Sequence, residues 1–400
     1  MERRQIPVDE LEFGMYVAEL DRPWTDTPFL FQGFNIQSQQ QINALKKFCK
    51  HVFVDLERTA KPDPRPPAVQ PQFPIRGSTP YSEQVTVEVE FKQAATVYDK
   101  SVATIAELLK PAAKPGGVLE AKEVKDSVTR LADSVERNPD AMLLVTRLRD
   151  KSAAAHARAL QVSIYLIVFA RFLQLSREEL ELLGLLGLLQ DVGKTRLPAE
   201  LMERKGPLSA QENEIAKRHV EYSAEILAGT PGLPPKLPEL ALLHHERQDG
   251  TGYPRGLKGD EIGLYGSMAA IADTFDALTA VRPYAEPLSP SGALSYLYKE
   301  RGFGFHADLV EQFIQCVGVF PVGSVVELNS GEVGIVITQN LVRRLKPRVM
   351  VVLDGKGNPM HPHKILDLDR DPKASADEVY KIKRTMEQSK ISIDPREMFI

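Results

Sequence analysis

Hydrophobic positions follow a helical spacing over most of the chain. From residue 151 to about 315 the pattern is almost wholly helical and rich in Leu and Ala. The most apolar stretch, Ala159–Ala170, lies between Arg158 and Arg171. It is too short to span a bilayer and therefore predicts a helix buried in a protein core. Further helical patterns occur at about 84–110, 118–136 and 141–150.

Alternating hydrophobic and polar positions predict strands near both ends of the chain. YVAEL and HVFVDL in the first 60 residues have this pattern, and QSQQQINALKKFC between them is typical of a helix. From about residue 322, SVVELNSGEVGIVITQN and RVMVVLD alternate around glycine turns. The predicted fold class is mainly α, with a small N-terminal α/β module and a short C-terminal β segment.

A proline-rich stretch marks the main boundary between domains. Residues 61–80 hold seven prolines, which favour a stiff spacer over a helix or a sheet. We expect six consecutive parts: an α/β module at 1–60, a proline-rich linker at 61–82, a helical connecting segment at 83–150, a helical domain at 151–320, a β segment at 321–375 and a charged tail at 376–400. The connecting segment is interpreted as a packing or homodimerisation element.

Composition narrows the class of protein. The net charge of -4 and the pI of about 6.1 give no overall attraction to nucleic acid or to an anionic membrane. The chain has two cysteines, Cys49 and Cys316, which are too few for a disulfide framework. This low number fits a reducing compartment. The start, MERRQIPVDELEFG, lacks the apolar core of a signal peptide. We therefore expect a cytoplasmic protein without nucleic-acid or membrane partners.

Histidines and acids in apolar surroundings are the first candidates for chemistry. The helical region contains His156, His219, His244 and His245, and both Asp191 and Asp273 follow apolar runs. Buried carboxylates are costly unless they are paired or bind a metal. Together these side chains suit a transition-metal site. Each also has an ordinary structural explanation, such as an ion pair of Asp191 with Lys194 or of Asp273 with Arg282.

The adjacent pair His244 and His245 is more informative than either residue alone. Neighbours on a helix point about 100° apart, so we expect each histidine to face a different metal of a pair. The two carboxylate oxygens of Asp191 allow it to bridge such a pair. Two metals roughly 3.5–4 Å apart suit in-line displacement at phosphorus.

The segment HHERQDGTGYPRGLKG at 244–259 is the most specific motif of the chain. It resembles the HD-GYP family, a branch of the HD phosphohydrolases. The similarity continues in MAAIADTFDALTAVRPY at 268–284 and extends back through PLSAQENEIAKRH, QDVGK and His156, so it covers about residues 150–320. The N-terminal module also resembles the domain that often precedes HD-GYP.

The resemblance implies an HD-type helical bundle that binds two Fe or Mn ions and hydrolyses cyclic di-GMP through pGpG to GMP. It implies six metal ligands, which are His156, Asp191, His219, His244, His245 and Asp273. Lys194 then lies near the reacting phosphate and Arg282 contacts the substrate phosphate. The loop of Gly252, Tyr253 and Pro254 is implied to contact GGDEF-domain proteins, the cyclases that make the substrate.

Three positions depart from the family pattern. Gln190 stands where the family has the histidine of its His-Asp pair, and such a loss should cost at least 10–100-fold in metal affinity or activity. Ser152 stands where three-metal members have a glutamate, and Ala285 where a basic residue is common. Two hypotheses follow: a two-metal phosphodiesterase with reduced activity, or a catalytically degenerate module that binds ligand or a GGDEF partner. Hydrolysis of another nucleotide is a third.

Overall fold

The chain forms two compact units, each with its own hydrophobic core. The computed structural model describes residues 3–22, 34–36, 39–56, 74–114, 116–149, 155–202, 204, 206–280, 287–386 and 398–399. The smaller unit comprises Met1–Gln70 with Arg343–Leu345, and the larger comprises Pro71–Val342 with Lys346–Ile400.

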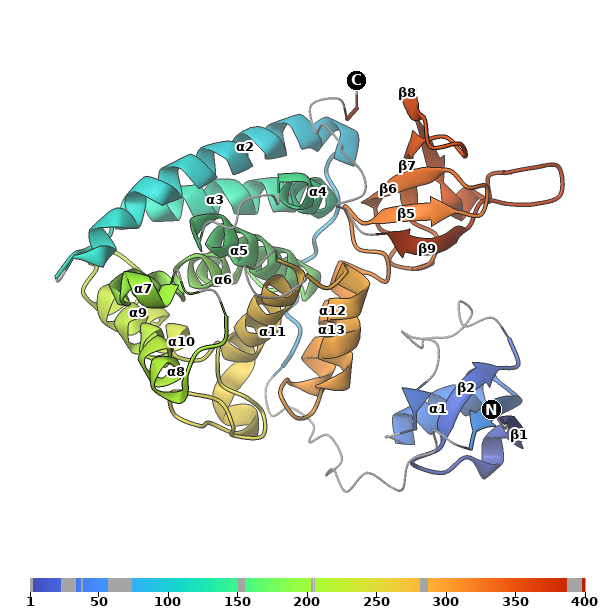
Figure 1. Ribbon diagram of the computed structural model, residues 1–400, viewed down its shortest axis with the longest axis horizontal. Coiled ribbons are helices and arrows are strands. Elements are labelled where there is room, and N and C mark those ends of the chain that lie inside the picture. Colours follow the sequence, from blue (N-terminus) through green and yellow to red (C-terminus); the bar gives the residue numbers. More distant parts are fainter. Residues whose placement is uncertain are drawn as a thin grey trace. The chain divides into compact units, whose positions relative to one another are not determined.

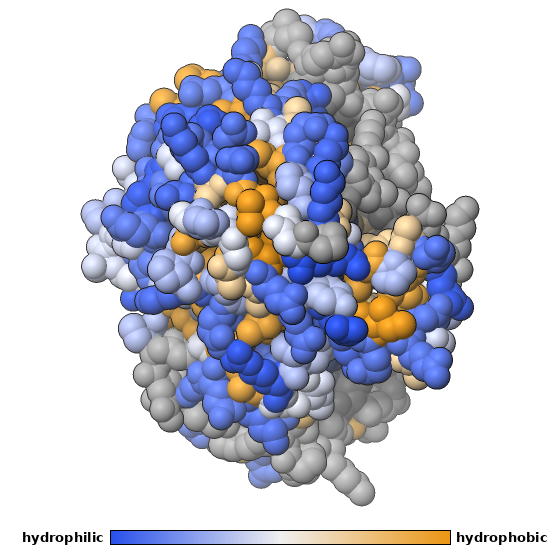
Figure 2. All heavy atoms as spheres, turned by 90° about the vertical axis from the view of Figure 1, so that its left-hand side faces the viewer, coloured by the Kyte–Doolittle hydropathy of each residue, from blue (hydrophilic) through white to orange (hydrophobic). Residues whose placement is uncertain are grey.

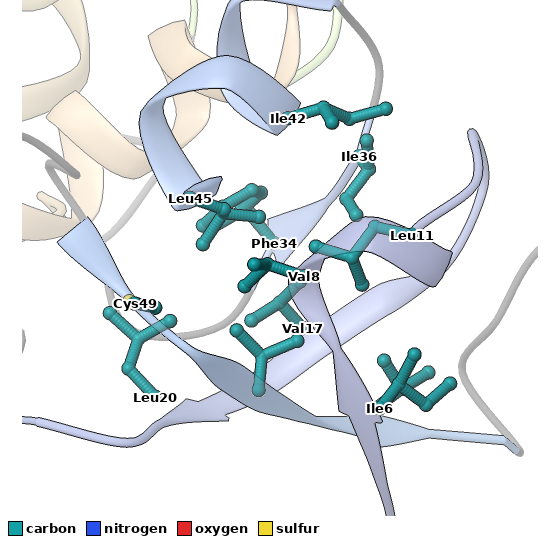
Figure 3. Close-up of a cluster of buried hydrophobic side chains, with 12 residues drawn as sticks. Ile6, Val8, Leu11, Val17, Leu20, Phe34, Ile36, Ile42, Leu45 and Cys49 are labelled. Atoms are coloured by element: carbon teal, nitrogen blue, oxygen red, sulfur yellow. The ribbon is translucent and has the colours of Figure 1, made fainter. Parts of the chain in front are cut away.

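The smaller unit is a four-stranded antiparallel sheet with one helix. The sheet order is β1-β4-β2-β3. Val17 of the sheet and Leu45 of the helix are fully buried in a shared core (Figure 3). Val52 and Val54 of the sheet belong to the same core and are also fully buried. The two strands and the helix that the sequence predicts here are confirmed. The elements are β1 (Arg3–Pro7), η1 (Val8–Glu10), β2 (Tyr16–Leu20), β3 (Phe34–Asn35), α1 (Gln39–Phe48) and β4 (His51–Asp55).

The larger unit is mainly helical, which confirms the predicted fold class (Figure 1). The long helix α2 packs along α3 and α4, and α5 packs against α6. The helices are α2 (Val87–Leu108), η3 (Lys110–Ala113), α3 (Ala121–Arg137), α4 (Pro139–Arg149), α5 (Ala155–Phe172), α6 (Arg177–Leu189), η4 (Val192–Arg196), α7 (Ala199–Met202), α8 (Ala210–Lys217), α9 (His219–Ala228), α10 (Leu237–Ala241), η5 (Gly259–Ile262), α11 (Gly263–Thr279), α12 (Pro290–Lys299) and α13 (Ala307–Val317).

Helix α5 is the centre of the helical bundle. Its side chains from Leu160 to Ala170 are nearly all buried, as its uninterrupted apolar sequence predicts. Three T-shaped ring contacts link α5, α11 and α13 to one another, with centroids 5.1–5.4 Å apart: Tyr165 with Phe275, Phe169 with Phe313, and Phe275 with Phe313. Such edge-to-face pairs add to the stabilisation from burial. They fix the two helices that carry His156 and Asp273.

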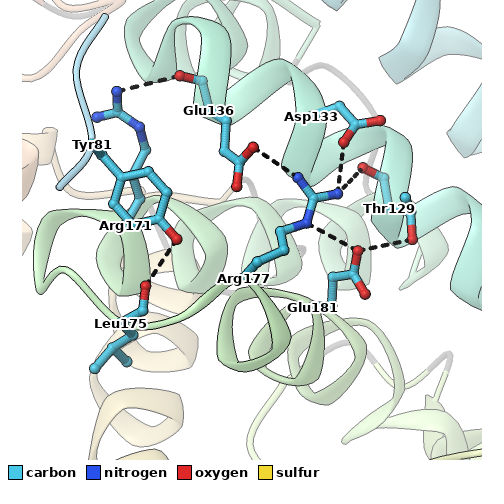
Figure 4. Close-up of polar contacts among 8 residues, drawn as sticks. All are labelled: Tyr81, Thr129, Asp133, Glu136, Arg171, Leu175, Arg177 and Glu181. Atoms are coloured by element: carbon cyan, nitrogen blue, oxygen red, sulfur yellow. Dashed lines mark hydrogen bonds and ion pairs between the residues drawn. The ribbon is translucent and has the colours of Figure 1, made fainter. Parts of the chain in front are cut away.

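A charged network on α3 and α6 holds the base of α6 in place (Figure 4). Arg177 at the start of α6 forms ion pairs with Asp133 at 2.6 Å, Glu136 at 3.0 Å and Glu181 at 3.0 Å. Ser176 caps the same helix in a reciprocal arrangement with Glu179. A cap of this kind satisfies otherwise unpaired backbone N–H groups. The direction of α6, and so the position of its C-terminal end, is set by these contacts.

The C-terminal part of the larger unit is a five-stranded antiparallel sheet in the order β8-β7-β6-β5-β9. The strands are β5 (Val325–Leu328), β6 (Val333–Thr338), β7 (Arg348–Leu353), β8 (Pro359–Asp367) and β9 (Ile382–Met386), with η6 (Leu368–Arg370) after β8. β9 lies within residues 376–400, which we expected to be a charged tail. The sheet therefore extends beyond residue 375, because β9 pairs with β5 through backbone hydrogen bonds that need no apolar side chains.

Apolar side chains lie mostly inside the units. The face shown in Figure 2 is largely hydrophilic, with apolar atoms gathered in patches between polar side chains. None of the helices in the described ranges has both the length and the apolar character needed to cross a membrane.

Candidate metal centre

Asp191 lies at the junction where α6 ends and η4 begins. Gln190 is the C-terminal cap of α6, and the chain then tightens into the 3-10 turn η4. Gly193 lets this turn touch α9, because a Cβ at this position would lie 2.1 Å from the His219 carbonyl oxygen and 2.5 Å from Ser223 N. Gly193 N donates to Ser223 Oγ at 2.8 Å. The glycine of QDVGK thereby brings Asp191 close to His219.

Backbone carbonyls orient two of the histidines toward Asp191. His219 Nδ1 lies 2.6 Å from the Ala216 carbonyl oxygen, and His244 Nδ1 lies 2.9 Å from that of Ala241. A carbonyl oxygen can only accept, so each Nδ1 carries the proton and each Nε2 presents a lone pair. These Nε2 atoms lie 3.1 Å and 3.4 Å from Asp191 Oδ1. Such carbonyl partners are the usual support of metal-binding imidazoles.

Asp191, His219, His244 and His245 form the one group of three or more potential ligands found in the described part of the chain. Their ligand atoms all lie within 4.8 Å of one another. Asp191 Oδ1, His219 Nε2 and His244 Nε2 are buried and lack a hydrogen-bond partner. A buried polar atom without a partner costs about 1–3 kcal/mol. Three facing lone pairs therefore fit a divalent cation, and nitrogen with carboxylate oxygen suits Fe, Mn or Zn.

The helical geometry on which the expectation of different metals for His244 and His245 depends is absent. The expectation assumed that both lie on a regular helix, but α10 ends at Ala241 and residues 242–245 form a turn. In the turn the imidazoles come together, with ring centroids 4.1 Å apart. Both histidines therefore belong to the same group of potential ligands.

The surroundings of Asp191 and His245 keep these two side chains in the forms that bind metal. Burial alone would raise the pKa of Asp191, but the charge of Lys194 holds it well below its usual value. The Lys194 ammonium lies 2.5 Å from Asp191 Oδ2. Burial, followed by the neighbouring His244, holds the pKa of His245 well below its usual value. A carboxylate and neutral imidazoles are the forms that bind metal.

The other predicted site residues lie outside this group of four. His156 is half-buried at the start of α5, and Asp273 is buried on α11. Gln190 is 1 % exposed, and its Oε1 and Nε2 both lack a hydrogen-bond partner. Arg282, together with Ser152 and Ala285, lies outside the described residues.

Sequence reasoning missed an ion pair between α5 and α11, in which Asp276 is buried and Arg158 is partly exposed. Nε and Nη2 of Arg158 on α5 each lie 3.0 Å from Asp276 Oδ2 on α11. This pairing could have been predicted from the sequence. Arg158 and Asp276 closely follow His156 and Asp273 in apolar segments, where a lone charge would need a partner. The pair ties together the two helices that carry these predicted ligands.

Comparison with known proteins agrees with this architecture. A model of the HD domain matches residues 143–308, and a model of a domain of unknown function (DUF3391) matches residues 3–124. The chain is 30% identical over 371 residues to the cyclic di-GMP phosphodiesterase PA4108 of Pseudomonas aeruginosa, covering 92% of this chain and 89% of that protein.

Two further relatives match about half of this chain. The 3'3'-cGAMP-specific phosphodiesterase 2 of Vibrio cholerae is 35% identical over 192 residues, which are 48% of this chain and 34% of that protein. The response regulator RpfG of Xanthomonas campestris, a cyclic di-GMP phosphodiesterase, is 33% identical over 217 residues, covering 51% and 57%. The helical fold and its His/Asp group thus define an HD-domain protein. Within that class, the chain belongs to the HD-GYP family.

Proposed function

We propose that this chain is a cyclic di-GMP phosphodiesterase that uses divalent metal bound by Asp191, His219, His244 and His245. The observation that carries the proposal is the convergence of these four ligand atoms within 4.8 Å, three of them buried without a hydrogen-bond partner. Similarity to PA4108 over most of both chains supports the substrate.

The chain's own side chains hold charge where phosphate chemistry needs it. A bound divalent cation would supply Lewis-acid activation of water and of a phosphate oxygen. Lys194 lies at the edge of the ligand group, 29 % exposed, where its ammonium can stabilise negative charge that develops on the phosphate. Its contact with Asp191 also keeps that carboxylate ionised. Arg282 is the second cation in the proposal, on the basis of the family resemblance alone.

The proposed metal is Fe or Mn, and it binds at two sites of unequal affinity. The group of three imidazoles and one carboxylate forms the tighter site. His156, Gln190 and Asp273, with Asp191 shared, form the second and weaker site. The neutral amide oxygen of Gln190 is a poorer ligand for Fe than an imidazole and suits harder ions such as Mn.

Metal analysis combined with a product assay tests the proposal. We expect the purified chain, loaded with Mn or Fe, to retain at least one metal per molecule by elemental analysis and to convert cyclic di-GMP slowly to pGpG or GMP. Asp191→Asn, which keeps the side-chain shape, should lose tight metal binding and turnover together. A metal-loaded chain that hydrolyses neither cyclic di-GMP nor 3'3'-cGAMP would instead fit the degenerate signalling module.

We also propose two protein associations, one with a GGDEF-domain protein and one between two copies of this chain. Contact of Gly252, Tyr253 and Pro254 with a GGDEF-domain protein, and a homodimer through residues 83–150, both follow from the sequence interpretation. Light scattering of the full chain, alone and with a purified GGDEF domain, measures both associations.

A further inference from the structure

The loop after the histidine pair, residues 248–258, folds back onto the metal ligands. Tyr253 N donates to the His245 carbonyl oxygen at 3.2 Å. The Tyr253 ring stacks on the His245 imidazole, with centroids 4.7 Å apart and planes 27° from parallel. The Lys217 ammonium lies 5.5 Å from the centre of the same tyrosine ring, within the range of a cation–π contact. The tyrosine ring thus covers one face of a metal ligand.

A buried carboxylate holds the far side of this loop. Glu246 is 1 % exposed and follows His245 directly in the chain. Its Oε1 accepts from Arg255 N at 2.8 Å, and its Oε2 accepts from Leu257 N at 3.0 Å. Hydrogen bonds from backbone N–H groups to an ionised carboxylate are stronger than those between neutral groups. Both oxygens of Glu246 are therefore committed to the loop.

Gly252 allows the loop to lie this close. A Cβ on Gly252 would come within 2.4 Å of Arg247 N and 2.5 Å of the Glu246 Cα, which are backbone atoms that cannot turn aside as a side chain can. Any other residue at this position would push the loop, and with it Tyr253, away from His245. Close approach of two backbones is a characteristic use of glycine.

We infer that the loop 248–258 acts as an intramolecular brace for the metal centre, with Tyr253 and Glu246 as positioning residues for His245. His219 and His244 are oriented by backbone carbonyls, whereas the His245 ring is stacked on the ring of Tyr253. Stacking fixes the tilt of the imidazole, and Glu246 fixes the loop that carries the stacking ring. The inference rests on the proposed metal-dependent function.

Titration of metal-free full-length chain with Mn²⁺ by calorimetry tests the brace without reference to turnover. We expect Tyr253→Leu and Glu246→Gln to weaken Mn²⁺ binding about 10–100-fold, the range found when supports of metal ligands are removed. Tyr253→Phe should bind as the unchanged chain does, because the ring face makes the contact. Tyr296→Leu and Glu123→Gln are matched controls. Tyr296 and Glu123 are both exposed, and both lie outside the loop 248–258 and the group of ligands.

The melting temperature of the metal-free variants separates positioning from general support of the fold. Weaker Mn²⁺ binding at an unchanged melting temperature supports the brace. Unchanged Mn²⁺ affinity in both Tyr253→Leu and Glu246→Gln overturns it. If one of the two fails to fold, the other decides. Failure of the unchanged chain to bind Mn²⁺ would refute the metal centre itself, whereas binding without cyclic di-GMP hydrolysis would refute only the proposed activity.

Discussion

Gln190 is a buried polar residue that directly precedes the metal ligand Asp191. Both polar atoms of its carboxamide are buried without a hydrogen-bond partner. Leaving such atoms unpaired is costly, so the side chain occupies a position where polar ligand atoms are useful and an apolar residue would otherwise be more stable. Its location directly before Asp191 makes the amide a candidate ligand of the weaker metal site proposed above.

Restoring the histidine should strengthen the weaker metal site. We predict that Gln190→His raises the metal content toward two per chain and increases cyclic di-GMP turnover at least 10-fold, since an imidazole replaces a neutral amide as ligand. Elemental analysis and the product assay measure both effects. Gln211→His, on the exposed side of α8, controls for the mere addition of an imidazole. Identical metal content in the two variants would show that position 190 does not bind metal.

At the residue scale, the sequence predicts the kinds of ligand better than their geometry. Histidines and acids in apolar segments, with the family motif, identified all four members of the group. The arrangement of His244 and His245 was missed, because the helical spacing rule was applied to residues that lie in a turn. The stacking of Tyr253 on His245 could not be predicted either, because a glycine-rich loop can fold in many ways that local sequence does not distinguish.

Among the elements, the joint between α4 and the C-terminal sheet contains an unusual acid. Asp140 in the first turn of α4 is 7 % exposed and accepts a hydrogen bond from Gln339 N, just after β6, at 3.0 Å. Burial raises the pKa of Asp140 to about 7, although this hydrogen bond from Gln339 acts in the opposite direction. The joint is therefore most stable when Asp140 is protonated.

This joint should make the stability of the larger unit depend on pH. The pKa of Asp140 is higher in the folded chain than the ordinary value of 3.8, so its contribution is complete below pH 3.8 and is lost as the pH rises through about 7. We predict that Asp140→Asn raises the free energy of unfolding at pH 8, on the order of 2–4 kcal/mol, and has little effect near pH 4. Urea denaturation at both pH values measures the difference.

An exposed acid provides the control for this pH dependence. Asp126 on α3 is exposed, so Asp126→Asn should leave the pH profile of the unchanged chain intact. A gain from Asp140→Asn that is equal at pH 4 and pH 8 would contradict the titration of Asp140 in this range.

At the scale of elements, periodicity found most of the structure. The predicted helices at 84–110, 118–136 and 141–150 correspond to α2, α3 and α4, and the strands around the glycine turns correspond to β5, β6 and β7. β9 was not predicted, because its sequence, IKRTM, is polar and lies in a charged segment. A strand of that kind is recognised only through its partner, and the partner β5 lies more than 50 residues earlier.

On the scale of the whole molecule, the two units have separate cores. The core of the smaller unit is built from side chains between Ile6 and Val54, and the metal centre belongs to the larger unit. The proline-rich sequence indicated a division near residues 61–82, and the units divide between Gln70 and Pro71.

Separate cores should give separate unfolding transitions. We predict two transitions in scanning calorimetry of the metal-loaded full chain, of which only one falls when the metal is removed by a chelator. Metal at 100 times its Kd stabilises the unit that binds it by about 2.7 kcal/mol. Val54→Asp, at a position that is fully buried, should lower only the other transition. A single transition that shifts as a whole with metal would mean that the units unfold together.

The order of strands in the C-terminal sheet also bears on how the protein is made. β5 has two neighbours, β6, which follows it directly, and β9, which leaves the ribosome last of the five. Until β9 has been synthesised, one edge of β5 exposes unpaired N–H and C=O groups that can pair with another nascent chain. A premature stop codon between β8 and β9 would therefore leave a product that contains every metal ligand and yet tends to aggregate.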